Sequence, residues 1–237
     1  MISPHPSKKS KAFTVMEALT VLVVVVFLVL VFLPSRSKTP ATWTPIRDCA
    51  DNLSMLGRSL TDFAEDHNGN FPPETSVTNG GSKEFLTSGK VISQFEAASW
   101  DPDEPWLLHC PDDKLKVCAA SVKINDSDDK PTPLLANLHL DDRNLSYFMS
   151  INALGRSSQV ILAGDRNLTT NGSPVQPGQF ALTTNLAIGW SHEMHMRAGS
   201  PCGNILFADG HVETTDTKSL AGLVRKQPLQ TNLLMIP

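Results

Sequence analysis

A long apolar run near the N-terminus constrains this chain more than any other feature of its sequence. Residues 18–33 carry no charged side chain, and Glu17 alone interrupts the run back to Phe13. A helix over 13–33 would be about 30 Å long, the thickness of the hydrocarbon core of a bilayer. Because the residues 1–12 carry lysines, the positive-inside rule places them in the cytoplasm. The sequence therefore predicts a single-pass membrane helix, with the following domain on the outer side.

Charge separates the N-terminal tail from the rest of the chain. Residues 1–12 hold three lysines and no acidic residue, whereas the chain after residue 33 holds 17 Lys and Arg against 23 Asp and Glu, a net charge of −6. Binding to nucleic acid needs a concentration of basic side chains that displaces counterions from phosphates. The acidic body therefore argues against nucleic acid as a partner, and we expect none.

Glu17 is an unusual residue for a simple membrane anchor. A carboxylate in the middle of a bilayer costs about 2.5–3.5 kcal/mol, less near the interface, so such a residue usually has a functional partner. An ordinary secretory signal peptide is also disfavoured, because the apolar run is longer than a usual signal core and no A-x-A site closes it.

The residues around Glu17 resemble the type IV prepilin signal. Residues 11–21 read KAFTVMEALTV, and the family pattern is a basic leader, Gly, and then FTLIELLVV. In that family a prepilin peptidase cuts before the Phe and the new amine is methylated, which implies cleavage between Ala12 and Phe13. Glu17 then falls on the fifth mature position, where the family's glutamate pairs with the N-terminal ammonium during assembly. Ala12 stands where the family has Gly.

The segment after the apolar run divides the chain into parts. Three prolines within 34–45 each forbid a helix interior, so this segment predicts a linker rather than one continuous helix. Thr44 as N-cap and Pro45 at the first helical position then begin an amphipathic helix of about twenty residues, which ends near residues 66–70. The predicted parts are a leader at 1–12, a transmembrane helix at 13–33, a linker at 34–44 and an exported domain at 45–237.

The remaining sequence predicts short antiparallel strands, and the fold class is therefore α+β, with an N-terminal membrane helix and an amphipathic helix packed on an antiparallel sheet. Asp209-Gly210 suits a type I′ turn between two strands of a hairpin. Polar segments at 74–83 and 119–143 predict surface loops. The predicted strands are 145–152, 160–165, 180–190, 204–208, 211–215 and 233–236, with a short helix over 219–226.

Other segments also resemble pilin-like proteins. The C-terminal processing-associated motif of that family has a His, nine residues and then Asp-Gly, and His195, Asp209 and Gly210 match it with thirteen intervening residues. A longer loop around 197–202 would preserve a pairing of His195 with the hairpin. The motif implies a structural hydrogen bond or, more specifically, interaction or processing. Further matches lie at 48–53 (DCADNL), 66–72 (DHNGNFP), 109–113 (HCPDD), 146–147 (SY) and 164–167 (GDRN).

A metal site is the main catalytic alternative. His192, His195, Asp209 and His211 are candidate ligands, and an anchored metal-dependent hydrolase would use them. However, His192 and His195 are one residue too close for the HExxH motif. We therefore expect no metal and no other cofactor.

Four cysteines, Cys49, Cys110, Cys118 and Cys202, would form disulfides in an exported domain. The sequence leaves three pairings open. Cys49 and Cys110 lie in family-like segments, and the resemblance favours pairing these two and joining Cys118 to Cys202. A bond between Cys110 and Cys118 is the rival, and four reduced cysteines are the remaining alternative.

These features predict a structural subunit of a type IV pilus-like filament or of a type II secretion pseudopilus, and not an enzyme. The resemblance implies a bacterial inner-membrane protein with a cytoplasmic N-terminus and a periplasmic domain, assembled into an envelope or surface filament. Its expected partners are prepilin peptidase, other pilin or pseudopilin subunits and membrane lipid. A single-pass anchored binding protein that does not polymerise is the alternative.

Overall fold

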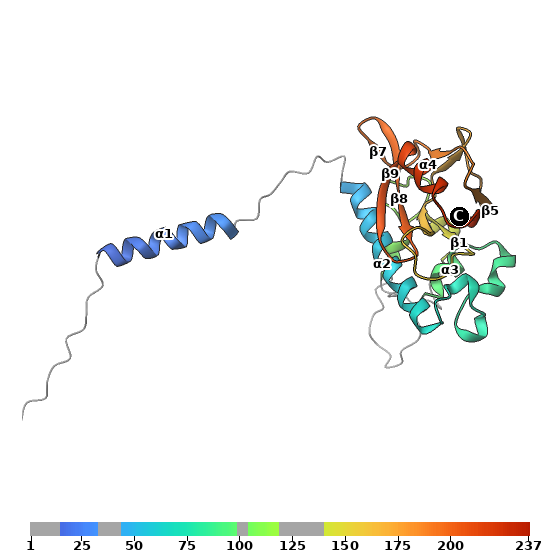
Figure 1. Ribbon diagram of the computed structural model, residues 1–237, viewed down its shortest axis with the longest axis horizontal. Coiled ribbons are helices and arrows are strands. Elements are labelled where there is room, and N and C mark those ends of the chain that lie inside the picture. Colours follow the sequence, from blue (N-terminus) through green and yellow to red (C-terminus); the bar gives the residue numbers. More distant parts are fainter. Residues whose placement is uncertain (1–14, 33–43, 99–103, 119–139) are drawn as a thin grey trace, which may run out of the picture. The chain divides into compact units, whose positions relative to one another are not determined.

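The computed structural model describes residues 15–32, 44–98, 104–118 and 140–237 (Figure 1). The contacts divide the chain into two units, residues 1–39 and residues 40–237. Helix α1 (Val15–Phe32) belongs to the first unit. The second unit, called the body below, contains the sheets and the other helices.

The prediction of a membrane helix over 13–33 is wrong. In the described residues, no helix is both long enough and apolar enough to cross a membrane. Helix α1 covers 18 residues, which at 1.5 Å per residue is about 27 Å, whereas the hydrocarbon core is about 30 Å thick. The prediction also counted residues 13, 14 and 33, which lie outside the described residues. The single-pass inner-membrane localisation depended on that helix and is wrong for the same reason.

The predicted fold class, with its membrane helix, is wrong as well. The body is mostly antiparallel sheet with a few helices. The larger sheet has the strand order β5-β10-β1-β2-β8-β7, and β9 also pairs with β8. Its strands are β1 (Tyr147–Ser150), β2 (Ile161–Asp165), β5 (Gly178–Thr183), β7 (Met196–Arg197), β8 (Ser200–Phe207), β9 (Val212–Asp216) and β10 (Thr231–Ile236).

A second, three-stranded sheet and several short helices surround the larger sheet. The small sheet has the order β4-β3-β6. Its strands are β3 (Leu168–Thr170), β4 (Ser173–Pro174) and β6 (Ile188–Trp190). The helices of the body are α2 (Thr44–Asp66), α3 (Ile92–Glu96) and α4 (Thr217–Arg225), with 3-10 turns η1 (Pro72–Glu74), η2 (Val77–Asn79), η3 (Lys83–Ser88), η4 (Pro105–Leu108) and η6 (Asp142–Asn144).

Helix α2 confirms the predicted amphipathic helix after the linker, and Figure 1 shows it running alongside β8 and β9. Asn68 takes the left-handed conformation (φ 57°) just beyond the helix, and the Gly69 N–H donates a hydrogen bond of 2.7 Å to the carbonyl of Ala64. These contacts end the helix where the sequence predicts. The apolar face is buried, and its residues are Ile46, Cys49, Leu53, Leu56, Leu60, Phe63 and Ala64.

The larger sheet carries a hydrophobic cluster on each face, because successive side chains of a strand point to opposite faces. On β1, Tyr147 and Met149 join the cluster that contains the α2 residues, whereas Phe148 joins the other cluster. Leu220 and Val224 of α4 belong to that second cluster, which also includes residues of the small sheet. The sheet therefore lies between α2 on one side and α4 with the small sheet on the other.

The C-terminal hairpin is present as predicted, but its turn differs from the prediction. A type I′ turn needs positive φ angles at both central residues. Gly210 has φ 91°, whereas Asp209 is not among the described non-glycine residues with positive φ. The N–H of Gly210 donates to the carbonyl of Phe207, and the N–H of Phe207 donates to the carbonyl of His211. The loop therefore has three residues and closes with glycine in the left-handed conformation.

Other predicted elements match in place but not in extent. The predicted strand over 180–190 is two strands, β5 and β6, which belong to different sheets. Strands β3, β4 and β7 were not predicted. The predicted loop over 74–83 contains the 3-10 turn η2, and residues 119–139 of the other predicted loop lie outside the described residues.

Candidate functional site

A disulfide joins α2 to the segment after η4. Cys49 and Cys110 are bonded, with S–S 2.06 Å and Cα atoms 5.0 Å apart. Both side chains are fully buried. The predicted pairing of Cys49 with Cys110 is confirmed, and the rival pairing of Cys110 with Cys118 is wrong.

The predicted bond between Cys118 and Cys202 is wrong. Cys118 is exposed, whereas Cys202 is a buried thiol on β8. Burial raises the pKa of the Cys202 thiol to about 11. A thiol with such a pKa stays protonated at neutral pH, so Cys202 is a weak nucleophile.

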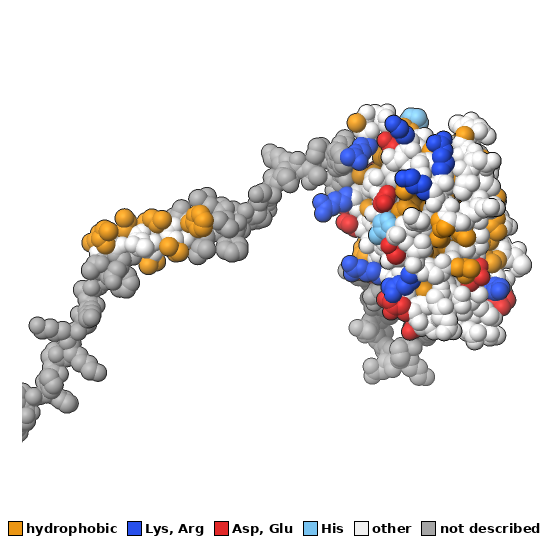
Figure 2. Space-filling view, in the orientation of Figure 1, with side chains coloured by type: hydrophobic (Ala, Val, Ile, Leu, Met, Phe, Trp, Pro, Cys, Tyr) orange, Lys and Arg blue, Asp and Glu red, His pale blue; other side chains and the backbone are white. Residues whose placement is uncertain are grey.

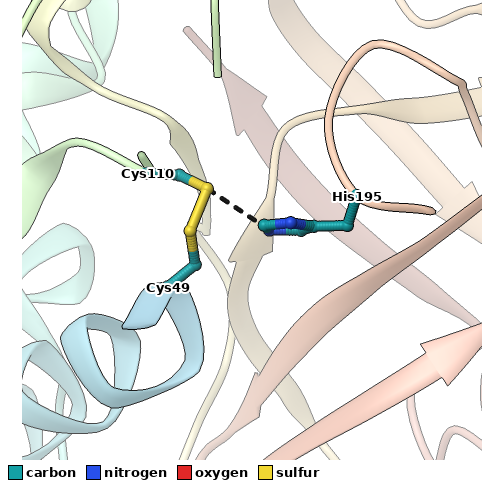
Figure 3. Close-up of side chains that lie close together, drawn as sticks. All are labelled: Cys49, Cys110 and His195. Atoms are coloured by element: carbon teal, nitrogen blue, oxygen red, sulfur yellow. Dashed lines mark hydrogen bonds between the residues drawn. A yellow bond between two sulfur atoms is a disulfide. The ribbon is translucent and has the colours of Figure 1, made fainter. Parts of the chain in front are cut away.

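His195 lies against the disulfide. Its Nε2 atom is 3.3 Å from Cys110 Sγ, and Figure 3 shows the imidazole ring directed edge-on at the Cys49–Cys110 bond. Its Nδ1 atom is 2.8 Å from Asp112 Oδ2. The backbone holds His195 in place, because its carbonyl accepts a hydrogen bond of 3.1 Å from the N–H of Cys202 on β8. The ring is therefore fixed between the segment of Cys110 and Asp112 and strand β8, which are far apart in the sequence.

Asp165, at the end of β2, completes this cluster. Its Oδ2 atom lies 3.4 Å from His195 Nε2 and accepts a hydrogen bond of 2.6 Å from the N–H of Asn204. Its Oδ1 atom has no hydrogen-bond partner among the described residues. Burial raises the pKa of the Asp165 carboxyl to about 6, and the nearby His195 opposes that rise. We call Cys49, Cys110, Asp112, Asp165 and His195 the histidine cluster.

An ion pair lies beside the histidine cluster. Arg166 donates to both carboxylate oxygens of Asp113, from Nε at 2.7 Å and from Nη2 at 2.8 Å. Its Nη1 atom also lies 3.3 Å from Glu193 Oε2. Burial alone would raise the pKa of the Asp113 carboxyl, but the hydrogen bonds and charge of Arg166 outweigh burial and lower that pKa.

Gly203 and Asn204 fix the position of β8 against its neighbours. A Cβ atom on Gly203 would lie 2.7 Å from the Trp190 ring, so only glycine lets β8 pass this close to the indole. The side chain of Asn204 donates to the carbonyl of Ile46 in α2 at 3.1 Å and accepts from Thr214 Oγ1 at 2.7 Å. Together with the backbone bond to Asp165, these contacts tie β8 to α2, β2 and β9.

Asp209 and Gly210 lie apart from the histidine cluster. Asp209 Oδ1 pairs with Nδ1 of His211, whose ring stacks on Phe207 with centroids 4.3 Å apart. The structure thus pairs His195 with Asp112 and Asp165, and Asp209 with His211. The match to the family motif therefore does not correspond to a contact between the His195 and Asp209 side chains.

The four ligands of the alternative hydrolase are not gathered into one site. His192 lines an open pocket of about 730 Å³ beside β3 and β6. His195 is buried with the disulfide, and Asp209 and His211 form the hairpin pair. Within the described residues, the group of ligand atoms close enough to hold a metal ion is Cys49 Sγ, Cys110 Sγ and one ring nitrogen of His195.

Sequence reasoning missed several residues of the site. Asp112 and Asp113 lie in the HCPDD segment, and Asp165 and Arg166 lie in GDRN. Both segments were noted as resemblances, but only the structure brings them to His195. The signal was their density of charge beside apolar strands, since such charges are buried only in pairs. Ala12 and Phe13 lie outside the described residues, as does the side chain of Glu17.

The burial of the cluster limits its chemistry. Cys49, Cys110, Asp165 and His195 are each 0% exposed, so none of them meets a substrate from solvent in this conformation. What the arrangement does is hold α2, the segment after η4, β2 and β8 together. Comparison of the chain with protein-family models, with curated proteins and with solved structures finds no match.

Proposed function

We propose that this chain is a structural subunit of a pilus-like filament or a secretion pseudopilus, and that copies of it associate through α1. The observation that supports this proposal most directly is the surface of α1. Its described side chains are exposed and, apart from Thr20, apolar, with Val15 84%, Leu22 60% and Phe27 64% exposed. Figure 2 shows these hydrophobic side chains along the helix. A helix that is apolar on all sides is stable when other apolar surfaces cover it.

Other copies of α1 are the occupant that this surface fits. The exposed side chains are aliphatic and aromatic with no described charge among them, so they offer no basis for a polar partner. Two faces of identical helices can cover each other, and a head-to-tail contact that repeats without closing produces a filament. The resemblance to prepilins supports this assignment and adds processing by prepilin peptidase before Phe13.

The body supports a structural role more than a catalytic one. In the histidine cluster, Cys49, Cys110, Asp165 and His195 are each 0% exposed, and the Asp112 side chain is 28% exposed. The disulfide and the pair between Asp113 and Arg166 join segments that are far apart in the sequence. Such crosslinks suit a subunit that has to keep its shape in an assembly.

Site-specific photocrosslinking tests the association. A photoreactive phenylalanine analogue would replace Leu22 on α1 or, as the control, Val77 on η2, another exposed apolar residue. In the full chain, we expect crosslinks between copies from position 22 but not from position 77. Adding Leu19→Asp should abolish them, because it places a charge on the packed surface. Monomers alone at both positions would contradict the proposal.

Mass spectrometry of the protein from its native cells tests the processing. We expect a chain that begins at a methylated Phe13 and that depends on prepilin peptidase. A chain that begins at Met1, together with the absence of crosslinks, would instead favour the non-polymerising binding protein.

A further inference from the structure

We propose that the dithiol form of this chain binds one zinc ion through Cys49 Sγ, Cys110 Sγ, His195 Nε2 and the carboxylate of Asp165. In the disulfide form the same place is held by the bond between the two cysteines. The body could thus be crosslinked at Cys49 and Cys110 either by the disulfide or by a zinc ion. This inference is independent of the role proposed for α1.

The candidate ligands have the chemistry and spacing of a zinc site. The two sulfur atoms and the His195 nitrogen lie within 4.8 Å of one another. Zinc in structural sites is tetrahedral and takes thiolate, imidazole and carboxylate ligands at about 2.0–2.3 Å, so its ligand atoms are about 3–4 Å apart. Asp165 Oδ2 is 3.4 Å from His195 Nε2 but lies outside this group of three, so it would take the fourth position only after its side chain turns toward the sulfur atoms. Small side-chain rotations after reduction would therefore complete the coordination.

His195 is already oriented as a metal ligand. Its Nδ1 atom is 2.8 Å from Asp112 Oδ2, so this nitrogen can donate its hydrogen to the carboxylate. In that tautomer Nε2 carries the lone pair, and this atom is 3.3 Å from Cys110 Sγ, the contact that the dashed line in Figure 3 marks. A metal-bound histidine characteristically donates its other ring N–H to a carboxylate in this way. Asp112 would hold the ring but not bind the metal.

One buried polar atom of the cluster lacks a partner in the described part of the disulfide form. Asp165 Oδ1 has no hydrogen-bond partner among the described residues, although the side chain is fully buried. Buried polar atoms without partners are uncommon and call for a specific explanation. A cation bound between the thiolates, His195 and Asp165 would place a positive charge beside this carboxylate.

The exchange between the two forms balances chemically. A dithiol or phosphine reductant supplies two electrons, the Cys49–Cys110 bond breaks, and two protons give two thiols. The dithiol becomes a cyclic disulfide, or the phosphine takes an oxygen from water and becomes its oxide. Zinc then displaces the two thiol protons, which are released to solvent. Because the disulfide is fully buried, the dithiol form is best prepared by reduction of the unfolded chain and refolding.

The zinc content of the refolded protein tests the proposal directly. The full chain would be refolded with zinc in the dithiol form and in the disulfide form, and loosely bound metal would be removed with a weak chelator. We expect about one zinc ion per dithiol chain and none per disulfide chain. Equal zinc in both forms would overturn the proposal.

Variants identify the ligands. Cys110→Ser should lose the zinc, and Asp112→Asn should weaken zinc binding about 10- to 100-fold through the loss of orientation. Cys202→Ser, at a buried thiol outside the ligand set, and His211→Gln, at a histidine of the hairpin, are the controls and should keep it. Retention of zinc in Cys110→Ser, or its loss in both controls, would count against the assigned ligands.

Cobalt gives a readout that needs no variant. When Co²⁺ replaces zinc in the wild-type dithiol chain, two thiolate ligands should produce charge-transfer absorption in the near ultraviolet, and tetrahedral geometry should produce strong visible bands. The weak visible spectrum of octahedral Co²⁺ would overturn the proposal even if some variants failed to fold. Failure of this test would leave crosslinking through α1 unchanged, so the two proposals are distinguishable.

Discussion

Arg166 and Asp113 form a bidentate ion pair whose side chains are almost completely buried. The guanidinium donates from Nε at 2.7 Å and from Nη2 at 2.8 Å, and the side chains are 11% and 0% exposed. The pair joins the end of β2 to the segment that carries Cys110. A buried charge is tolerated only while its partner is present, so this contact ties the fold of one segment to that of the other.

Removing one partner of this pair should strongly destabilise the body. We expect Arg166→Ala to lower the free energy of unfolding by about 3–5 kcal/mol, because it leaves the Asp113 carboxylate buried and unpaired. The control is Arg143→Ala, which breaks the exposed pair with Asp141 and should have no measurable effect. Urea unfolding of the oxidised protein measures both. Equal stability of the two variants would show that the buried pair contributes nothing.

The same pair predicts a dependence of stability on pH. Arg166 lowers the pKa of Asp113 in the folded protein below its ordinary value of 3.8 against the effect of burial. The stabilisation is therefore fully present above pH 3.8 and declines below it, because the unfolded chain then takes up the proton first. The stability difference between wild type and Asp113→Asn should shrink as the pH falls below about 4. A difference that stays constant down to pH 2 would contradict this account.

The disulfide should stabilise the body by an amount that increases with the length of the loop it closes. Cys49 and Cys110 are 61 residues apart, and closing a loop of that size in the unfolded state is worth about 4 kcal/mol. We expect the double variant Cys49→Ser/Cys110→Ser to lose about this much when assayed without metal. Cys118→Ser, at an exposed cysteine outside the bond, is the comparison. Guanidinium unfolding curves that coincide for the two variants would exclude a stabilising role.

Local signals in the sequence were sufficient for the helix and the hairpin. Thr44-Pro45 and Asn68-Gly69 mark the two ends of α2 through backbone preferences that need no tertiary contact. Asp209-Gly210 likewise located the hairpin, but not its loop length, because the pairing of Phe207 with His211 decides that. The apolar run predicted a membrane helix from its length, but no helix in the described residues, α1 included, is long and apolar enough to cross a membrane.

The candidate site depends on contacts that no local pattern contains. Cys110, Asp113 and His195 meet partners that are 53 to 85 residues away in the sequence. The resemblance marked the segments that converge, and it favoured the correct pairing of Cys49 with Cys110. It also directed attention to Asp209, whereas the carboxylates beside His195 are those of Asp112 and Asp165. Matching a motif identifies which residues matter without saying which of them touch.

The passage of β8 over Trp190 gives a last prediction. A Cβ atom at Gly203 would lie 2.7–2.8 Å from three carbon atoms of the indole ring, which Nε1 anchors through a hydrogen bond of 3.2 Å to Thr215 Oγ1. We expect Gly203→Ala to destabilise the body by about 1–3 kcal/mol, because either the strand or the ring has to move.

Gly222 in α4 is the matched control, since no atom lies within 4 Å of a Cβ placed there. Gly222→Ala should stabilise the body by about 0.5–1 kcal/mol through the higher helix propensity of alanine. Thermal unfolding should therefore shift in opposite directions for the two Gly→Ala variants. If Gly203→Ala were as stable as wild type or more stable, the contact with Trp190 would not require glycine.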